Sequence, residues 1–326
     1  MKFLLTAINA KFIHSNPAIY SLRAGVGEKL QPYVELAEFT INESLESILE
    51  GIWKRQPKVI GFSCYIWNWK LIREILMELP KILPDTEIWL GGPEVTYDGP
   101  GLLREFPQVT GIMVGEGEVT FREVLGQYVR EAESTGQSEQ QPEPDSIEQQ
   151  AADRTGTVSG KNVAERFGQI SGLCLASGYT APRELTDLTT LPFLYEDMEP
   201  FTNRIIYYET SRGCPYRCSY CLSSIDKKVR LRDIDVVKRE LQFFLDQNVK
   251  QVKFIDRTFN CDHKHAMEIW RYIYEHDNGV TNFHFEISAD ILREEEIALL
   301  NRFRPGLAQL ELSLIHISEP TRPEPI

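Results

Sequence analysis

Three cysteines stand close together in the second half of the chain, Cys214, Cys218 and Cys221, with the spacing C-x3-C-x2-C. Thiolates are the ligands of soft metals and of iron–sulfur clusters. Cubane clusters are normally held by four cysteines, so three ligands would leave one metal position open for a substrate or cofactor. A structural zinc site is the alternative, with His263 or His265 as a fourth ligand, although both histidines follow the next expected strand.

The elements around the cysteines predict where they lie. The apolar segment 205–210 precedes them and is typical of a buried strand, so the cysteine loop is expected at a strand's carboxyl end. Chemistry is placed there in (βα) architectures. Expected helices and strands then alternate: helices at 235–247, 265–275 and 294–303, and strands at 251–255, 283–288 and 307–311. This alternation predicts a parallel sheet with helical crossovers.

The motif resembles the signature of the radical S-adenosylmethionine (SAM) superfamily, CxxxCxxC with an aromatic residue before the last cysteine, here Tyr220. The resemblance implies a [4Fe–4S] cluster on the three cysteines, whose open iron is chelated by SAM. It also implies one-electron cleavage of SAM to a 5′-deoxyadenosyl radical, and a (βα)6 partial barrel. The chain supplies four of the six barrel strands, so the radical SAM barrel is expected to be incomplete.

Two carboxylates are candidate SAM contacts by the same resemblance. Many relatives carry Gly-Gly-Glu at the end of the second barrel strand, where this chain has Asp256 followed by Arg257. Asp256 is therefore expected at the SAM amino group, or else in an ion pair with Arg257. Glu286 lies in an aromatic-rich strand, where a carboxylate needs a partner. That partner is either the SAM ribose or amine, or an arginine, Arg212 or Arg257.

Two glycine motifs follow successive expected strands of the first half, Gly91-Gly92-Pro93-Glu94 and Gly115-Glu116-Gly117-Glu118. Open α/β sheets bind ligands at the carboxyl ends of their strands. Glycine there lets the backbone approach a large flat ligand. The pair resembles the Rossmann-like cobalamin-binding domain that precedes many radical SAM barrels, with Gly91, Gly92, Gly115 and Gly117 beside the cofactor. The alternative is that the glycines only form tight turns.

The sequence departs from one motif of cobalamin-binding domains, the motif that supplies the lower ligand of cobalt. Domains that supply a histidine to cobalt carry Asp-x-His-x-x-Gly after the first strand. Here His14 stands in the sequence Phe12-Ile13-His14-Ser15-Asn16, without the Asp or the Gly. No neighbouring carboxylate would orient the imidazole. We therefore do not expect His14 to bind cobalt.

The expected organisation is an α/β chain of two domains. The ranges are 1–133 for a cobalamin-binding-like domain, 134–168 for a disordered acidic linker, 169–203 for a connector, 204–311 for a truncated radical SAM core and 312–326 for a non-native tail. The tail, beginning Leu312-Ser313-Leu314-Ile315, resembles a translated sequencing adapter and then runs into several prolines.

Composition limits the class of protein and its partners. The net charge of −13 over 326 residues argues against general binding to nucleic-acid backbones. Absence of a long apolar run argues against membrane insertion, and scattered remaining cysteines favour a reducing cytoplasm. We expect a cobalamin-dependent radical SAM enzyme, a methyltransferase or a rearranging enzyme, that needs a reductant such as flavodoxin or ferredoxin. The alternatives are a radical SAM methylthiotransferase or cyclase without cobalamin, and a non-catalytic metal-binding protein.

Overall fold

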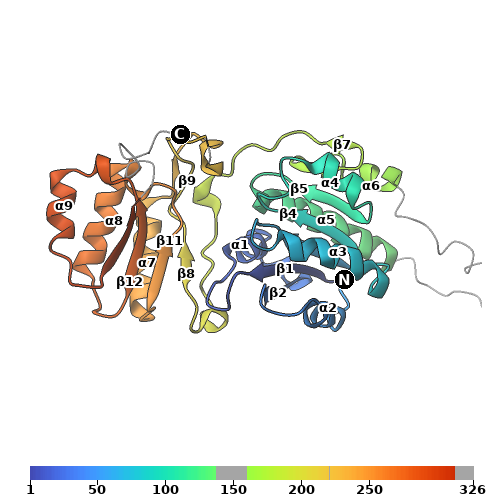
Figure 1. Ribbon diagram of the computed structural model, residues 1–326, viewed down its shortest axis with the longest axis horizontal. Coiled ribbons are helices and arrows are strands. Elements are labelled where there is room, and N and C mark those ends of the chain that lie inside the picture. The colour runs from blue at the N-terminus through green and yellow to red at the C-terminus, as the bar shows by residue number, and fades with distance from the viewer. Residues whose placement is uncertain (137–159, 220, 313–326) are drawn as a thin grey trace, which may run out of the picture. The chain divides into compact units, whose positions relative to one another are not determined.

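The computed structural model describes residues 1–136, 160–219 and 221–312. The chain divides into two compact units (Figure 1). The first unit comprises Met1–Thr186 with Leu194–Glu196, and the second comprises Asp187–Phe193 and the chain from Asp197 onward. Residues 313–326, which contain nearly all of the expected non-native tail, lie outside the described residues.

The first unit is built on a seven-stranded sheet with the order β2-β1-β3-β4-β5-β6-β7. The five strands from β2 to β5 are parallel, and β6 and β7 add an antiparallel hairpin at one edge. Strand β1 is buried at every position, as expected of a parallel strand covered on both faces. The strands are β1 (Phe3–Asn9), β2 (Val34–Thr40), β3 (Val59–Ser63), β4 (Glu87–Gly91), β5 (Val109–Met113), β6 (Leu173–Leu175) and β7 (Gly178–Tyr179).

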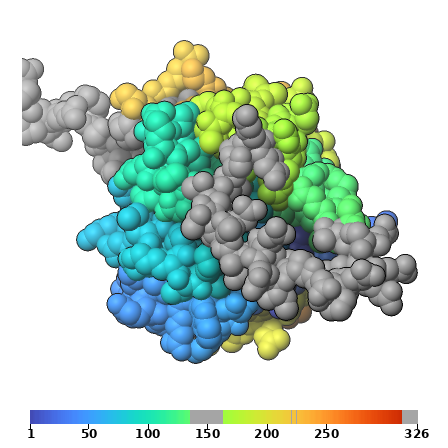
Figure 2. Space-filling model, turned by 90° about the vertical axis from the view of Figure 1, so that its right-hand side faces the viewer, coloured from blue at the N-terminus to red at the C-terminus, as the bar shows by residue number. Residues whose placement is uncertain are grey.

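Helices cover both faces of this sheet because alternate residues of β1 point to opposite sides. Leu4 and Ile8 pack with α2, α3 and α4, whereas Phe3 and Leu5 pack with α1, α5 and α6. In Figure 2 the colour passes from blue through cyan to teal, so consecutive segments of the first unit lie side by side across this face. The helices are α1 (Pro17–Gly25), α2 (Leu45–Trp53), α3 (Trp69–Ile82), α4 (Gly99–Glu105), α5 (Gly117–Gly136) and α6 (Gly160–Phe167).

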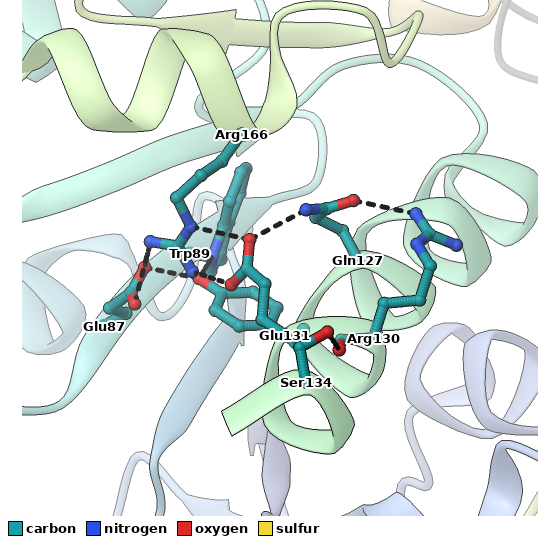
Figure 3. A network of polar contacts seen from close by, with 8 residues as sticks. Glu87, Trp89, Gln127, Arg130, Glu131, Ser134 and Arg166 are labelled. Carbon is teal, nitrogen blue, oxygen red and sulfur yellow. Dashed lines mark hydrogen bonds and ion pairs between the residues drawn. The ribbon is translucent and has the colours of Figure 1, made fainter. Parts of the chain in front are cut away.

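Of the expected linker, residues 137–159 lie outside the described residues, whereas its end and residues 169–186 of the connector take part in the first unit. Residues 160–167 form α6, and the β6–β7 hairpin joins the first sheet. Arg166 holds α6 in place through ion pairs with Glu87 of β4 and Glu131 of α5, at 3.0 and 2.9 Å (Figure 3). Tyr128 also donates a 2.6 Å hydrogen bond to Glu87. Long-range ion pairs therefore fix a helix whose own sequence is short and polar.

The second unit contains a four-stranded parallel sheet with the order β13-β12-β11-β8. Helices α7, α8 and α9 lie on one side of it (Figure 1). Aromatic rings fill the interface: Phe254 of β11 and Phe285 of β12 pack with Phe259 and Trp270. The elements are β8 (Ile206–Tyr208), α7 (Ile234–Asp246), β11 (Gln251–Phe254), α8 (His263–Glu275), β12 (Asn282–Ile287), α9 (Glu294–Leu300) and β13 (Ala308–Leu312).

The alternation of strands and helices predicted from the sequence is confirmed in both units. Within the described part of the chain, no helix is both long enough and apolar enough to cross a membrane.

Candidate functional site

The cysteine loop leaves the carboxyl end of β8 and is closed at its base by a two-stranded ribbon. Strand β9 (Ser211–Arg212) pairs antiparallel with β10 (Arg230–Leu231). Just above this pair, the N–H of Cys214 donates to the carbonyl of Asp226 at 2.9 Å. Gly213 has a φ of +95°, and a Cβ there would lie 2.4 Å from the carbonyl oxygen of Lys228. A glycine is therefore required where the two sides of the loop come together.

The three cysteines differ in exposure. Cys214 is 8 % exposed, and Cys218 and Cys221 are half-buried. A turn brings the last two together, because the N–H of Cys221 donates to the carbonyl of Cys218 at 3.1 Å. No three His, Cys, Asp or Glu side chains are arranged to hold a metal ion within the described ranges. The fit to a cluster therefore rests on the donor set, three thiols on one loop with a fixed base. Tyr220 lies outside the described residues.

Asp256 does not present a free carboxylate to a ligand. It is completely buried and accepts hydrogen bonds from the N–H and hydroxyl of Thr210 and from the hydroxyl of Ser211. Burial raises the pKa of Asp256 to about 6, although the Ser211 and Thr210 hydrogen bonds lower it. The predicted roles were a SAM contact or an ion pair with Arg257. The observed contacts instead join the end of β11 to the end of β8, directly before the cysteine loop.

Two further polar side chains of the loop after β11 were not singled out from the sequence. The hydroxyl of Thr258 lies 3.5 Å from the sulfur of Cys214. The amide of Asn260 donates to the carbonyl of Ser288 at 2.8 Å and accepts from its N–H at 2.9 Å. The hydroxyl of Tyr216, inside the cysteine loop, donates to the Ser288 hydroxyl at 3.3 Å. The loop after β11 thus connects the cysteine loop with the carboxyl end of β12.

A buried ion pair supports the cysteine loop from the side of α7. Arg232 makes two 2.7 Å contacts to Glu240, and both side chains are 8 % exposed. Glu240 also accepts a 2.6 Å hydrogen bond from Tyr208 of β8, and burial raises the pKa of that tyrosine. The Arg232 N–H donates to the Thr210 carbonyl at 2.8 Å. Both ends of the cysteine loop are therefore anchored to the same point on α7.

Glu286 faces away from the helices, on the other side of the four-stranded sheet. It pairs with Lys253 at 3.6 Å, whereas Arg212 pairs with Glu209. Lys253 also contacts Glu311, which lies 3.1 Å from the His284 ring. Burial and then the Lys253 charge lower the pKa of His284. This face of the sheet carries a charged cluster in which Glu286 has a protein partner other than the two arginines considered from the sequence.

In the first unit, exposed apolar side chains gather at the carboxyl ends of the strands. Phe12 and Ile13 follow β1, Ile66 and Trp67 follow β3, and Tyr97 follows β4. Ile66 is 81 % exposed, and Trp67 stacks on Tyr65 at a centroid separation of 4.4 Å. We call these five residues, Phe12, Ile13, Ile66, Trp67 and Tyr97, the apolar edge. Large exposed apolar groups gathered at a sheet's binding edge fit a broad apolar ligand such as a corrin ring.

Asn68 fixes the loop that carries Ile66 and Trp67. Its completely buried side-chain amide donates to the carbonyls of Ile8 and Ser63, at 3.0 and 2.9 Å. Its side-chain oxygen accepts the Tyr65 N–H at 2.8 Å. One side chain therefore joins β1, β3 and the start of α3.

The four glycines predicted to line the cofactor have different surroundings. Gly92 has a φ of +107°, and a Cβ there would lie 2.5 Å from the Cys64 carbonyl oxygen, so its close neighbour is the protein backbone. A Cβ on Gly117 would lie 2.9 Å from Leu22 of α1, whereas one on Gly91 would make only ordinary contact. Gly115 has a φ of +80° and open space around it. Of the four, Gly115 is the one whose surroundings leave room for a ligand. His14 is half-buried in the β1–α1 loop.

Comparison with protein families places two known domains on this chain. The B12-binding domain matches residues 4–125, and the radical SAM superfamily domain matches residues 208–323. The first range contains the apolar edge and, apart from Phe3, the five parallel strands of the first sheet, and the second contains the cysteine loop and strands β11, β12 and β13. The chain therefore contains a B12-binding domain followed by a radical SAM domain.

Individual relatives agree with this assignment. The chain is 28 % identical to the 2-(S-pantetheinyl)-carbapenam-3-carboxylate methyltransferase of Streptantibioticus cattleyicolor, over 67 % of this chain and 29 % of the relative. It is 27 % identical to the cobalamin-dependent radical SAM methyltransferase TokK of Streptomyces tokunonensis, over 63 % of this chain and 28 % of that protein. The chain thus spans less than a third of the length of either relative.

A solved structure shares the fold. The radical SAM methyltransferase TsrM from Kitasatospora setae matches 99 % of this chain and 60 % of its own, with a TM-score of 0.64 and 17 % identity. At this identity the match shows a common fold.

Proposed function

We propose that this chain forms the cofactor-binding part of a cobalamin-dependent radical SAM enzyme, a methyltransferase or a rearranging enzyme. One observation carries the proposal. The same chain combines a three-cysteine loop at the carboxyl end of a parallel strand with an apolar edge at the carboxyl ends of a separate α/β sheet. The two named methyltransferase relatives support it by similarity.

The residues divide between two tasks. Cys214, Cys218 and Cys221 would hold the cluster, and the β9–β10 ribbon fixes the start of their loop. The apolar edge would cover the flat face of cobalamin and exclude water, while the open space at Gly115 lets the backbone approach the cofactor. Bound there, the cluster supplies the electron that cleaves SAM, and cobalamin supplies a methyl carrier. A flavodoxin or ferredoxin would reduce the cluster.

The test is anaerobic reconstitution of the chain with iron, sulfide and hydroxocobalamin. After desalting, iron, acid-labile sulfide and bound corrinoid are measured, followed by 5′-deoxyadenosine formed from SAM and dithionite. We expect about four iron and four sulfide per chain, as one cubane cluster requires, together with bound corrinoid and deoxyadenosine.

Cys218→Ala should lose the cluster and SAM cleavage, whereas Cys261→Ala should keep both. Cys261 is the matched control, since it lies near the cysteine loop but outside the C-x3-C-x2-C spacing, and burial raises its pKa to about 11. Deoxyadenosine without corrinoid would instead favour a radical SAM methylthiotransferase or cyclase without cobalamin. Zinc without sulfide would favour a non-catalytic metal-binding protein.

A further inference from the structure

Three alternate side chains of the loop after β11, Asp256, Thr258 and Asn260, each reach a different element. Asp256 binds the end of β8, Thr258 contacts Cys214, and Asn260 binds the carboxyl end of β12. Asp256 and Asn260 are completely buried, and Thr258 is 5 % exposed. Asp256 and Asn260 are each held by more than one hydrogen bond. The backbone on both sides of Thr258 is therefore fixed. The Thr258 hydroxyl is therefore held beside the Cys214 sulfur.

The direction of the hydrogen bond between Thr258 and Cys214 depends on the state of the sulfur. Their oxygen and sulfur atoms lie 3.5 Å apart, and with a protonated thiol either group can donate. A metal-bound cysteine has lost its proton, so only the hydroxyl can then donate. The Thr258 hydroxyl also lies 2.9 Å from the carbonyl of Arg257. A negatively charged sulfur is the stronger acceptor of the two.

We propose that Thr258 is a positioning and redox-tuning residue of the cluster: its hydroxyl donates a hydrogen bond to the Cys214 sulfur and raises the cluster's reduction potential. The inference rests on the proposed function, because it requires Cys214 to be a cluster ligand. Reduction adds negative charge to a cluster and its sulfurs, so a donated hydrogen bond stabilises the reduced form more than the oxidised form. Cys214 is 8 % exposed, so water screens this interaction weakly.

The experiment compares the wild-type chain with Thr258→Val and Thr258→Ser after anaerobic reconstitution. Valine keeps the branched shape and removes the donor, whereas serine keeps the hydroxyl. Iron and acid-labile sulfide are measured first. Each cluster is then titrated with dithionite in the presence of redox mediators, and the electron paramagnetic resonance signal of the reduced cluster gives the midpoint potential.

We expect full cluster content in all three proteins, a midpoint potential shifted to more negative values in Thr258→Val, and a potential restored towards the wild-type value in Thr258→Ser. Should the valine variant assemble no cluster, Thr258→Ala takes its place, since it removes the hydroxyl without added bulk. A loss of packing alone would lower cluster content or stability and leave the potential of the assembled cluster unchanged.

Two negative results are distinguishable. A wild-type chain that assembles no [4Fe–4S] cluster overturns the proposed function, and the role of Thr258 with it. A wild-type cluster whose potential matches that of the hydroxyl-free variant overturns only the role of Thr258. The role of Thr258 is also overturned if Thr258→Ser has the same potential as Thr258→Val, because the side-chain hydroxyl would then have no effect.

Discussion

The carboxylate of Asp256 binds Thr210 twice, through the backbone N–H at 3.1 Å and the side-chain hydroxyl at 2.7 Å. The two residues are 46 positions apart in the sequence and lie after neighbouring parallel strands, β11 and β8. Thr210 is followed within a few residues by the first cysteine. Asp256 therefore determines where the cysteine loop begins.

The pKa of Asp256 gives stability a defined pH dependence. Burial raises this pKa from 3.8 to about 6, so between these values the folded chain binds a proton that the unfolded chain releases. Stability from this carboxyl is present at low pH and is lost as the pH rises through about 6. Over the window the loss is on the order of 3 kcal/mol. Urea unfolding of wild-type and Asp256→Asn chains should give a difference in unfolding free energy that shrinks with rising pH; a constant difference would contradict the raised pKa.

Exposed apolar side chains of the apolar edge should determine cobalamin affinity. Ile66→Glu places a charge on the most exposed of them, and we expect binding at least about tenfold weaker, from the lost apolar burial alone. The control is Met77→Glu, which alters a side chain of α3 that is 58 % exposed and outside the apolar edge. Equilibrium titration with hydroxocobalamin measures both. Equal affinities in the two variants would place the cofactor elsewhere.

Two glycines of the expected cofactor motifs should respond differently to alanine. Gly92→Ala puts a Cβ 2.5 Å from the Cys64 carbonyl and strains a positive φ, so we expect a loss of several kcal/mol, about 3 or more. Gly115→Ala meets open space, and we expect about 1 kcal/mol from its positive φ. Chemical unfolding compares the two. Similar losses would mean that backbone conformation, and not the contact with Cys64, dominates at Gly92.

The Arg166 network should contribute strongly to the stability of the first unit. Arg166→Met leaves Glu87, whose side chain is 14 % exposed, without its cation, and we expect a loss of about 3 kcal/mol. Arg130→Met is the control, because the exposed Arg130 side chain donates to Gln127, and its other contact in Figure 3 is the backbone carbonyl that accepts from Ser134. Thermal unfolding monitored by tryptophan fluorescence reports on both variants, since Trp89, one of the five tryptophans, donates to Tyr128 inside the network. Equal melting temperatures for the two variants would contradict a strong contribution of Arg166 to stability.

Local sequence patterns were sufficient for the main elements of the fold. The apolar run 59–63 is a buried strand and the alternating segment 251–254 is a half-buried strand, both in parallel sheets, and the cysteine loop follows a strand as expected. These predictions succeed because strand burial and crossover connectivity depend on short segments and their order.

What the sequence did not reveal depends on residues far apart in the chain. Gly92 was interpreted as making room for a ligand, but its close neighbour is the carbonyl of Cys64. Asp256 was expected at SAM or in an ion pair with Arg257, whereas its observed partner Thr210 follows a different strand, 46 positions away in the sequence. Helix α6 was placed in a linker because its anchor, Glu87, is 79 positions from Arg166. The polar residues at 256, 258 and 260 were the available signal for Thr258 and Asn260, in a segment that forms a turn and a short 3-10 helix after β11.

The ion pair between Arg166 and Glu131 also has a practical consequence for protein engineering. It joins α6 to α5, the two helices that flank residues 137–159, so these two helices are held beside each other. A reporter domain whose own termini lie close together, such as a fluorescent protein, can be grafted between these helices. Because Glu87 begins β4 and the apolar edge follows the other ends of the strands, such a graft would label the protein without covering the apolar edge.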